Sequence, residues 1–280
     1  MNGEILQLIA IASGANAALS GRWNASGFDE HQAFTYCQSV RFVELKRSMG
    51  KKKPIEDEVA ASPEGWFGLL NKQGARCVFL NYGSSKDQQA PDYQLVAFVG
   101  GGGTWTLGVS DGSSKVTYWV ARWLSRRSHP EGKPWEVTYG KVAESRSAPS
   151  VPLPDQTDLR KRFTSTLKDI RRLAQEIEAD NFEQFFDRGL RALDSADPMD
   201  HFPGDALARP MDYSLESRQL FAAAWASWVF GGMGSWNDLW IQDEQLSRRY
   251  DALSARLYDA ICQSIILTVN SAAQNNLVAN

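Results

Sequence analysis

The hydrophobic pattern of this chain changes its period near residue 150. Before that point, apolar, aromatic and β-branched residues gather in short segments typical of strands. The segments are residues 34–45, 75–82, 93–99, 104–109, 115–122 and 135–139. The glycine run 100–103 and the stretch S-D-G-S-S at 110–114 separate three of them and predict hairpin turns, because glycine tolerates positive φ. Consecutive hairpins predict an antiparallel sheet.

Two helices accompany these strands. Residues 62–71 have Pro63 at the first helical turn, a position that proline favours. The apolar run within the first 20 residues is preceded by Glu4 and by no lysine or arginine, which is the wrong charge for a secretory signal peptide. It predicts an amphipathic helix instead. The first part of the chain is therefore expected to be an α+β domain.

After residue 155 the pattern is helical. Apolar residues from Leu159 to Ile177 recur at steps of three and four, the stripe of an amphipathic helix that Thr157 or Asp158 would cap. The apolar face continues to Leu193 after a change of phase. A third helix is expected at 214–230, and a long one after Gly234. These segments predict a three- or four-helix bundle.

A proline-rich stretch separates the two patterns. Residues 147–155, S-A-P-S-V-P-L-P-D, hold three prolines, which disfavour a helix and stiffen the backbone. We therefore expect an antiparallel-sheet α+β domain over residues 1–147, a linker over 148–155 and a helical domain over 156–280.

Charge and cysteine content narrow the classes of function. The 280 residues carry a net charge of −3, with 17 lysines and arginines against 14 acidic residues in 1–147 and 13 against 19 in 148–280. This balance disfavours nucleic acid as the main partner, since nucleic-acid-binding domains usually carry a basic excess. Cys37, Cys77 and Cys262 form no C-x-x-C pair and suit reduced thiols in a cytoplasm. The apolar stretch 265–269 is too short to span a membrane.

The most distinctive motif is F-G-G-M-G-S-W-N-D-L-W at residues 230–240, called the glycine corner below. Gly231 or Gly232 would end a helix, and Ser235 with Asp238 matches a capping box that starts the next one. A phosphate-binding loop is disfavoured, because the motif lacks G-K-[ST] and Asp238 would repel a phosphate. A sharp bend between two helices explains most of the motif.

Tryptophans on both sides of the bend suggest a second role for it. Exposed indoles are common energetic centres of protein interfaces. The predicted binding site comprises Trp228, Gly231, Gly232, Gly234, Ser235, Trp236, Asn237, Asp238 and Trp240.

The stretch G-G-M-G-S-W-N-D resembles a G-G-M-G-S-x-N-D corner of poorly characterised bacterial helical proteins, some of them encoded near polymorphic-toxin or defence loci. The resemblance implies a bacterial source and a role in immunity or defence. It carries no established activity, and it covers the corner strongly and the last 70 residues loosely.

The remaining polar residues form no pattern typical of catalysis. The histidines His31, His129 and His201 lack metal-ligand spacing, so we expect no metal and no cofactor. An alternative binding site is the aromatic and basic stretch with Trp119, Arg122, Trp123, Arg126, Arg127 and His129. This stretch would bind nucleic acid. Alternatively, together with Glu136, it would bind a small ligand or substrate between the two halves of the chain.

Together these features predict a bacterial, cytoplasmic, non-enzymatic protein that binds a protein partner, such as a toxin or a subunit of a defence complex. An enzyme or ligand sensor, and more weakly a nucleic-acid-binding protein, are the alternatives. The long terminal helix also allows self-association.

Overall fold

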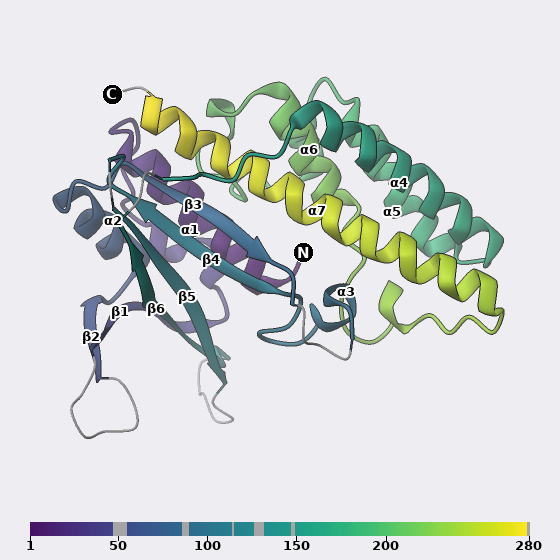
Figure 1. The fold of residues 1–280 in the computed structure, drawn as a ribbon, viewed down its shortest axis with the longest axis horizontal. Coiled ribbons are helices and arrows are strands. Elements are labelled where there is room, and N and C mark those ends of the chain that lie inside the picture. The colour runs from purple at the N-terminus through teal and green to yellow at the C-terminus, as the bar shows by residue number, and fades with distance from the viewer. Residues whose placement is uncertain (47–54, 86–89, 114, 126–131, 147–148, 279–280) are drawn as a thin grey trace.

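The computed structural model describes residues 1–46, 55–85, 90–113, 115–125, 132–146 and 149–278. It is an α+β fold (Figure 1). The helices are α1 Gly3–Leu19, α2 Pro63–Lys72, α3 Asp92–Leu95, α4 Gln156–Glu176, α5 Asp180–Leu193, α6 Leu215–Ala226 and α7 Glu244–Val278. The strands are β1 Cys37–Lys46, β2 Ile55–Ala60, β3 Cys77–Gly83, β4 Thr104–Ser110, β5 Val116–Ser125 and β6 Trp135–Ser145.

The six strands form one sheet in the order β2-β1-β6-β5-β4-β3. Four neighbouring pairs are antiparallel, but β1 and β6 run parallel, with Val40 opposite Val137. The expectation of a purely antiparallel sheet is therefore wrong. The alternation of apolar residues along a strand shows which face is buried, but it does not encode which strand lies alongside or in which direction.

Two segments of the first half differ from their predictions. Residues 93–99 were expected to form a strand, but Asp92–Leu95 form the short helix α3, which places Tyr93 and Val96 in the core. The glycines 100–103 are consequently not a hairpin turn. Residues 56–58 lie outside the expected strands, but they belong to the edge strand β2.

Helix α1 is buried on nearly all sides, so the expected amphipathic pattern is wrong as well. Ile9, Ile11, Ala12 and Ala15 have no exposed surface although they point in different directions around the helix. The helix contacts β3, α2 and α7, which places it between the sheet and the bundle (Figure 1). An apolar surface all round is typical of such a central helix.

The outer edge of β3 is paired with two asparagine side chains. Asn16 of α1 accepts a hydrogen bond from the Val78 amide at 2.9 Å and donates one to the Val78 carbonyl at 2.6 Å. Asn270 of α7 does the same for Leu80, at 2.7 and 2.9 Å. All four groups are buried. Each side-chain amide thus takes the place that a neighbouring strand would occupy.

Helices α4 to α7 pack as a bundle, and α7 extends from it along β3 and α1 (Figure 1). With 35 residues, α7 is ~50 Å long. By length and composition it could cross a membrane, but 72% of its most apolar window is buried inside the fold. A core helix meets the same criterion.

Most of the buried apolar side chains of the two halves form one continuous cluster. It runs from Phe42 of β1 through α1 to Leu167 of α4 and Ile261 of α7. In the expected linker, Val151 packs against Cys77 and Phe79 of β3, and the Pro152 carbonyl accepts a hydrogen bond from Asn270 at 2.9 Å. The described part of this stretch is therefore packed onto the fold. The proposed domain boundaries remain a prediction.

The helix ends in the bundle differ from those expected. Asp155 caps α4 by accepting a hydrogen bond from the Asp158 amide at 2.7 Å. The expected cap was Thr157 or Asp158. Helix α6 ends at Ala226 instead of residue 230, and α7 begins at Glu244 instead of directly after Gly234. The glycine corner is therefore longer and less helical than its capping pattern suggests.

Candidate functional site

The glycine corner is an ordered turn between α6 and α7. Its backbone is held by hydrogen bonds from the Ser235 amide to the Gly232 carbonyl, 3.1 Å, and from the Trp236 amide to the Val229 carbonyl, 3.2 Å. Gly234 adopts the left-handed conformation, with φ of +79°. Gly231 and Gly232 do not end a helix as predicted, because α6 has already ended at Ala226, with Ser227 as its C-cap.

Ser235 and Asp238 do not form the predicted capping box at the start of a long helix; each accepts a hydrogen bond from a different backbone amide around a 3-10 turn, Trp236–Asp238. The Ser235 hydroxyl accepts a hydrogen bond from the Asn237 amide at 3.3 Å. The Asp238 carboxylate reaches back and accepts one from the Gly234 amide at 2.5 Å. These two contacts fix the shape of the corner.

Two of the predicted binding tryptophans are buried. Trp236 has no exposed surface; its ring packs edge-on against Phe182 and Phe186, and its Nε1 donates to Ser254 Oγ at 2.7 Å. Trp228 is 8% exposed and donates to the Phe230 carbonyl at 2.6 Å. Both rings fill the bundle core and cannot contact a partner in this conformation, so the expectation that they are displayed is wrong.

A different pair of apolar side chains is displayed. Trp240 is 88% exposed and Met233 is fully exposed. Asn237 points inward, and its Nδ2 donates to the Tyr93 carbonyl of α3 at 2.9 Å. The corner is therefore anchored on one side to the core through Trp236 and on another to α3, and it presents Met233 and Trp240 to solvent.

The alternative aromatic and basic site is divided between the two faces of the sheet. Trp119 is buried against Trp66 of α2, whereas Arg122 lies on the opposite face and pairs with Glu56 at 2.7 Å. Successive residues of a strand point to opposite faces, which explains the separation. Arg126, Arg127 and His129 lie outside the described residues. Glu136 lies on the same face of the sheet as Arg122, because Arg122 pairs with Thr138 and Leu124 pairs with Glu136.

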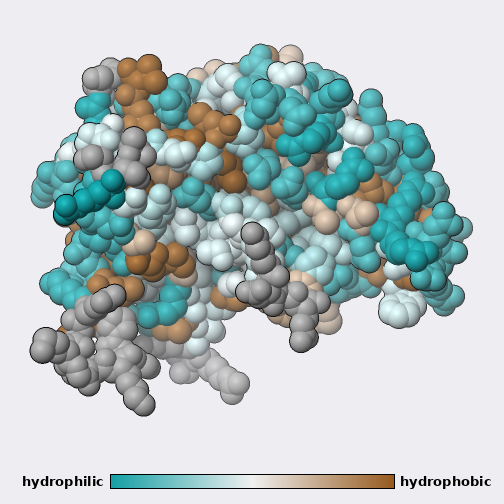
Figure 2. Space-filling view, viewed as in Figure 1, coloured by the Kyte–Doolittle hydropathy of each residue, from teal (hydrophilic) through white to brown (hydrophobic). Residues whose placement is uncertain are grey.

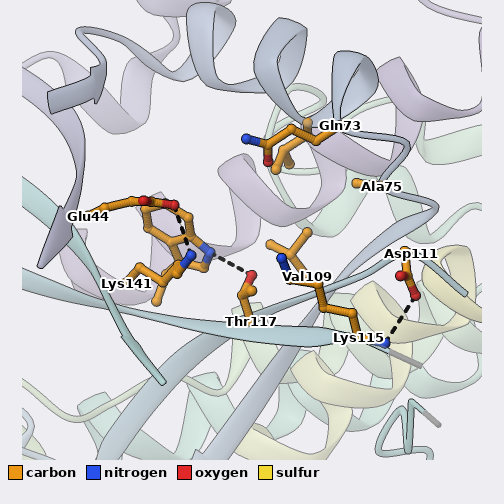
Figure 3. A pocket seen from close by; sticks show the side chains of 10 residues that line it. Glu44, Gln73, Ala75, Val109, Asp111, Lys115, Thr117 and Lys141 are labelled. Carbon is orange, nitrogen blue, oxygen red and sulfur yellow. Dashed lines mark hydrogen bonds and ion pairs between the residues drawn. The ribbon is translucent and has the colours of Figure 1, made fainter. Parts of the chain in front are cut away.

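In the view of Figure 2, separate patches of hydrophobic residues are scattered over the left part of the molecule, where the sheet and the end of α7 lie, whereas hydrophilic residues dominate the surface of the bundle. The exposed apolar residues of the strands include Leu45, Leu124 and Val142. On the opposite face, the end of α2 and four strands enclose a groove of about 310 Å³ (Figure 3), called the sheet groove below.

The sheet groove has an apolar floor and a charged rim. Leu70, Val109 and Trp119 line its floor. At the rim, Lys141 Nζ lies 2.8 Å from Glu44 and 3.6 Å from Glu144 (Figure 3 shows the pair with Glu44), and Lys115 Nζ lies 3.4 Å from Glu144. Each lysine is paired with a carboxylate, so the groove suits a small molecule with an apolar body and polar ends. No local sequence pattern indicates the sheet groove, because its residues are brought together only when the sheet forms.

In comparisons with known proteins, no family model, no curated protein and no solved structure matches the chain. Among the described residues, no three His, Cys, Asp or Glu side chains are placed to share a metal ion. Functional inference therefore depends on the surfaces of this chain alone.

Proposed function

We propose that this chain is a non-enzymatic protein-binding protein that holds its partner through Met233 and Trp240. The observation that carries the proposal is that Trp240 is 88% exposed and Met233 is fully exposed within the same ordered corner. Tryptophan is rarely left so exposed, and it is the residue most enriched among the energetic centres of interfaces.

The construction of the corner supports this role. The buried ring of Trp236 anchors the turn in the core, and the hydrogen bond from Asn237 to the Tyr93 carbonyl anchors it to α3. A turn that is already ordered loses little conformational freedom on binding, so more of the contact energy appears as affinity. Met233 is flexible and polarizable, which suits an apolar pocket on a partner.

The biological setting belongs to the same proposal. The resemblance of the corner to bacterial proteins encoded near toxin and defence loci supports a cytoplasmic immunity or defence role. The partner would then be a bacterial toxin or a subunit of a defence complex.

Site-specific crosslinking tests the proposal. A photo-reactive phenylalanine analogue placed at position 240 should capture a partner in cells of the source organism, whereas the same group at Tyr36, which is 67% exposed on the sheet half, should not. With the purified partner, Trp240→Ala and Met233→Ser should each weaken binding by ~10-fold or more. Equal capture at both positions, or unchanged affinity of both variants, would overturn the proposal.

The sheet groove favours a second candidate, binding of a small ligand. Its volume of about 310 Å³ and its apolar floor with polar rim match ordinary small-molecule sites. A metabolite screened by thermal shift should stabilise the protein, lose its effect in Lys141→Met and keep it in Trp240→Ala. A ligand that stabilises Lys141→Met as well as the parent protein would exclude this groove.

A further inference from the structure

A second, smaller groove lies where the ends of β5 and β6 meet the first turn of α1 and the segment that follows α3. It has a volume of about 170 Å³ and is called the tryptophan groove below. Its apolar lining comprises Trp123, Trp135, Val96, Phe98 and Val99. The sheet groove and the glycine corner share none of these residues.

Two indole rings form the walls of the tryptophan groove. Trp123 of β5 lies opposite Val137, and Ser125 lies opposite Trp135 of β6, so that both tryptophans point to the same face of the sheet. Their ring centroids are 5.8 Å apart and their planes meet at 77°. Phe98 is 67% exposed and adds a third aromatic ring at the rim.

The polar side chains of the lining are Asn2, whose side-chain amide is hydrogen-bonded to the backbone of Val96 and Ile5, and the carboxylate of Glu4. Glu4 lies in the first turn of α1, and its two oxygens are 3.0 and 3.2 Å from the amide nitrogen of Gly100. Within the described part of the chain, no cationic side chain forms an ion pair with Glu4. Burial raises the pKa of its carboxyl group, since the hydrogen bond from Gly100 offsets only part of the desolvation.

Aromatic walls beside an uncompensated carboxylate are complementary to a cation that carries apolar surface. An alkylated ammonium group has both properties, because its methyl groups contact the rings and its charge is attracted by their π faces and by the carboxylate. A primary ammonium group is more strongly hydrated and would lose more on entering the groove. The volume suits the head group of a small molecule.

We propose that the tryptophan groove binds the trimethylammonium group of a choline-sized molecule against Trp123, Trp135 and Glu4. This site is independent of the proposed protein-binding corner, and either proposal can fail without the other.

Choline and 3,3-dimethylbutan-1-ol form a matched pair of probes, because the alcohol has the same shape with carbon in place of the charged nitrogen. Calorimetric titration of the full chain should show choline binding ~10-fold or more tightly than the alcohol. Equal affinity for the two probes, or binding of the alcohol alone, would mean that the groove is only an apolar pocket and would overturn the proposal.

Variants of the residues that line the tryptophan groove test whether choline binds there. Glu4→Gln keeps an acceptor for the Gly100 amide but removes the charge, and it should weaken choline binding by ~5-fold or more. Trp123→Leu should weaken it further, and Trp123→Phe, which keeps an aromatic ring if the leucine variant fails to fold, should weaken it less. Trp240→Ala serves as the control and should bind choline like the parent chain.

Two further outcomes would overturn the proposal. In the first, choline binding is unchanged in Glu4→Gln. In the second, a trimethyllysine peptide binds while free choline does not, which would assign the groove to a modified protein side chain instead of a small molecule.

Discussion

The most consequential single residues in this fold are two buried asparagines. Asn16 and Asn270 each pair with both the amide and the carbonyl of one residue on the outer edge of β3. An edge strand that is covered by helices has no water to satisfy these groups, and each one left unpaired costs about 1–3 kcal/mol. The two side chains therefore allow β3 to be buried at the edge of the sheet.

Asn270→Ala should lower the free energy of unfolding by about 3–5 kcal/mol, because it leaves the amide and the carbonyl of Leu80 buried without partners. Urea denaturation measures the change. Ser271→Ala is the matched control, since Ser271 lies on the same helix and bonds only to the carbonyl of Thr268. Similar small losses in the two variants would show that water satisfies the β3 edge.

At the residue scale, the sequence shows which residues are aromatic or polar, but not whether their side chains are buried or exposed. The pair Trp236 and Trp240 lies four residues apart on an expected helix, which would place both rings on one face. The turn places one ring in the core and the other in solvent. Asn16 and Asn270 gave no signal at all, because a polar residue in an apolar helix reveals its partner only when the sheet is in place.

At the scale of elements, β2 is a highly charged edge strand held by ion pairs. Glu56 lies 2.7 Å from Arg122 and 3.0 Å from Arg41, and the hydrogen bond and charge of Arg122, with a smaller contribution from Arg41, lower the pKa of its carboxyl group. A lowered carboxyl pKa stabilises the fold above the unfolded-state value and ceases to do so as the pH falls through the folded-state value.

Glu56→Gln should therefore destabilise the protein by about 0.5–1 kcal/mol at pH 7, the range for partly exposed pairs, and the difference should disappear in acid. Urea denaturation at neutral pH and at a series of lower pH values measures both effects. Glu58→Gln, which removes a single longer contact of 3.6 Å with Arg41, should cost less. A deficit that persists unchanged in acid would contradict the ion-pair explanation.

The glycine corner should be far more sensitive to change at its buried ring than at its exposed one. Trp236→Phe removes the hydrogen bond to Ser254 and leaves part of a cavity among Phe182 and Phe186, so we expect a loss of about 2–4 kcal/mol. Trp240→Ala should change stability by less than ~0.5 kcal/mol. Thermal unfolding compares the two, and comparable losses would mean that Trp240 is packed in solution.

Most helices and strands are predictable from the periodicity of apolar residues. Which helices and strands lie next to one another is not. Strands at 104–109 and 115–122 and the helix at 62–71 are confirmed, because alternation, turn residues and Pro63 all act locally. The segment at 93–99 failed because Tyr93 and Val96 are drawn into the core from a helical turn. Both grooves are assembled from separated strands and helices, so no local pattern could reveal them.

Over the whole molecule, the sheet and the bundle share one buried cluster. Cys37 on β1 and Cys262 on α7 belong to this cluster, whereas Cys77 on β3 lies in a smaller one with Phe79 and with Ala273 of α7; all three cysteines are buried. Burial raises the pKa of the Cys77 thiol to about 12 and that of Cys262 well above its usual value. Native thiols of this kind react slowly, since the thiolate is the reactive species.

Cys77 and Cys262 should therefore become reactive toward a thiol reagent at the same urea concentration, although they belong to different halves of the chain. Pulsed alkylation followed by mass spectrometry resolves the two sites. Exposure of Cys262 before Cys77 would show that the bundle unfolds separately and would support independent domains over residues 1–147 and 156–280.

The dependence of β3 on Asn270 has a consequence for synthesis. Leu80 is made 190 residues before its partner, so a growing chain on the ribosome holds an unpaired, apolar strand edge for most of its translation. Such an edge is a template for pairing with another nascent chain. We expect chains that stop before α7 to aggregate through β3, and ribosome-bound chaperones to protect this edge until the final helix emerges.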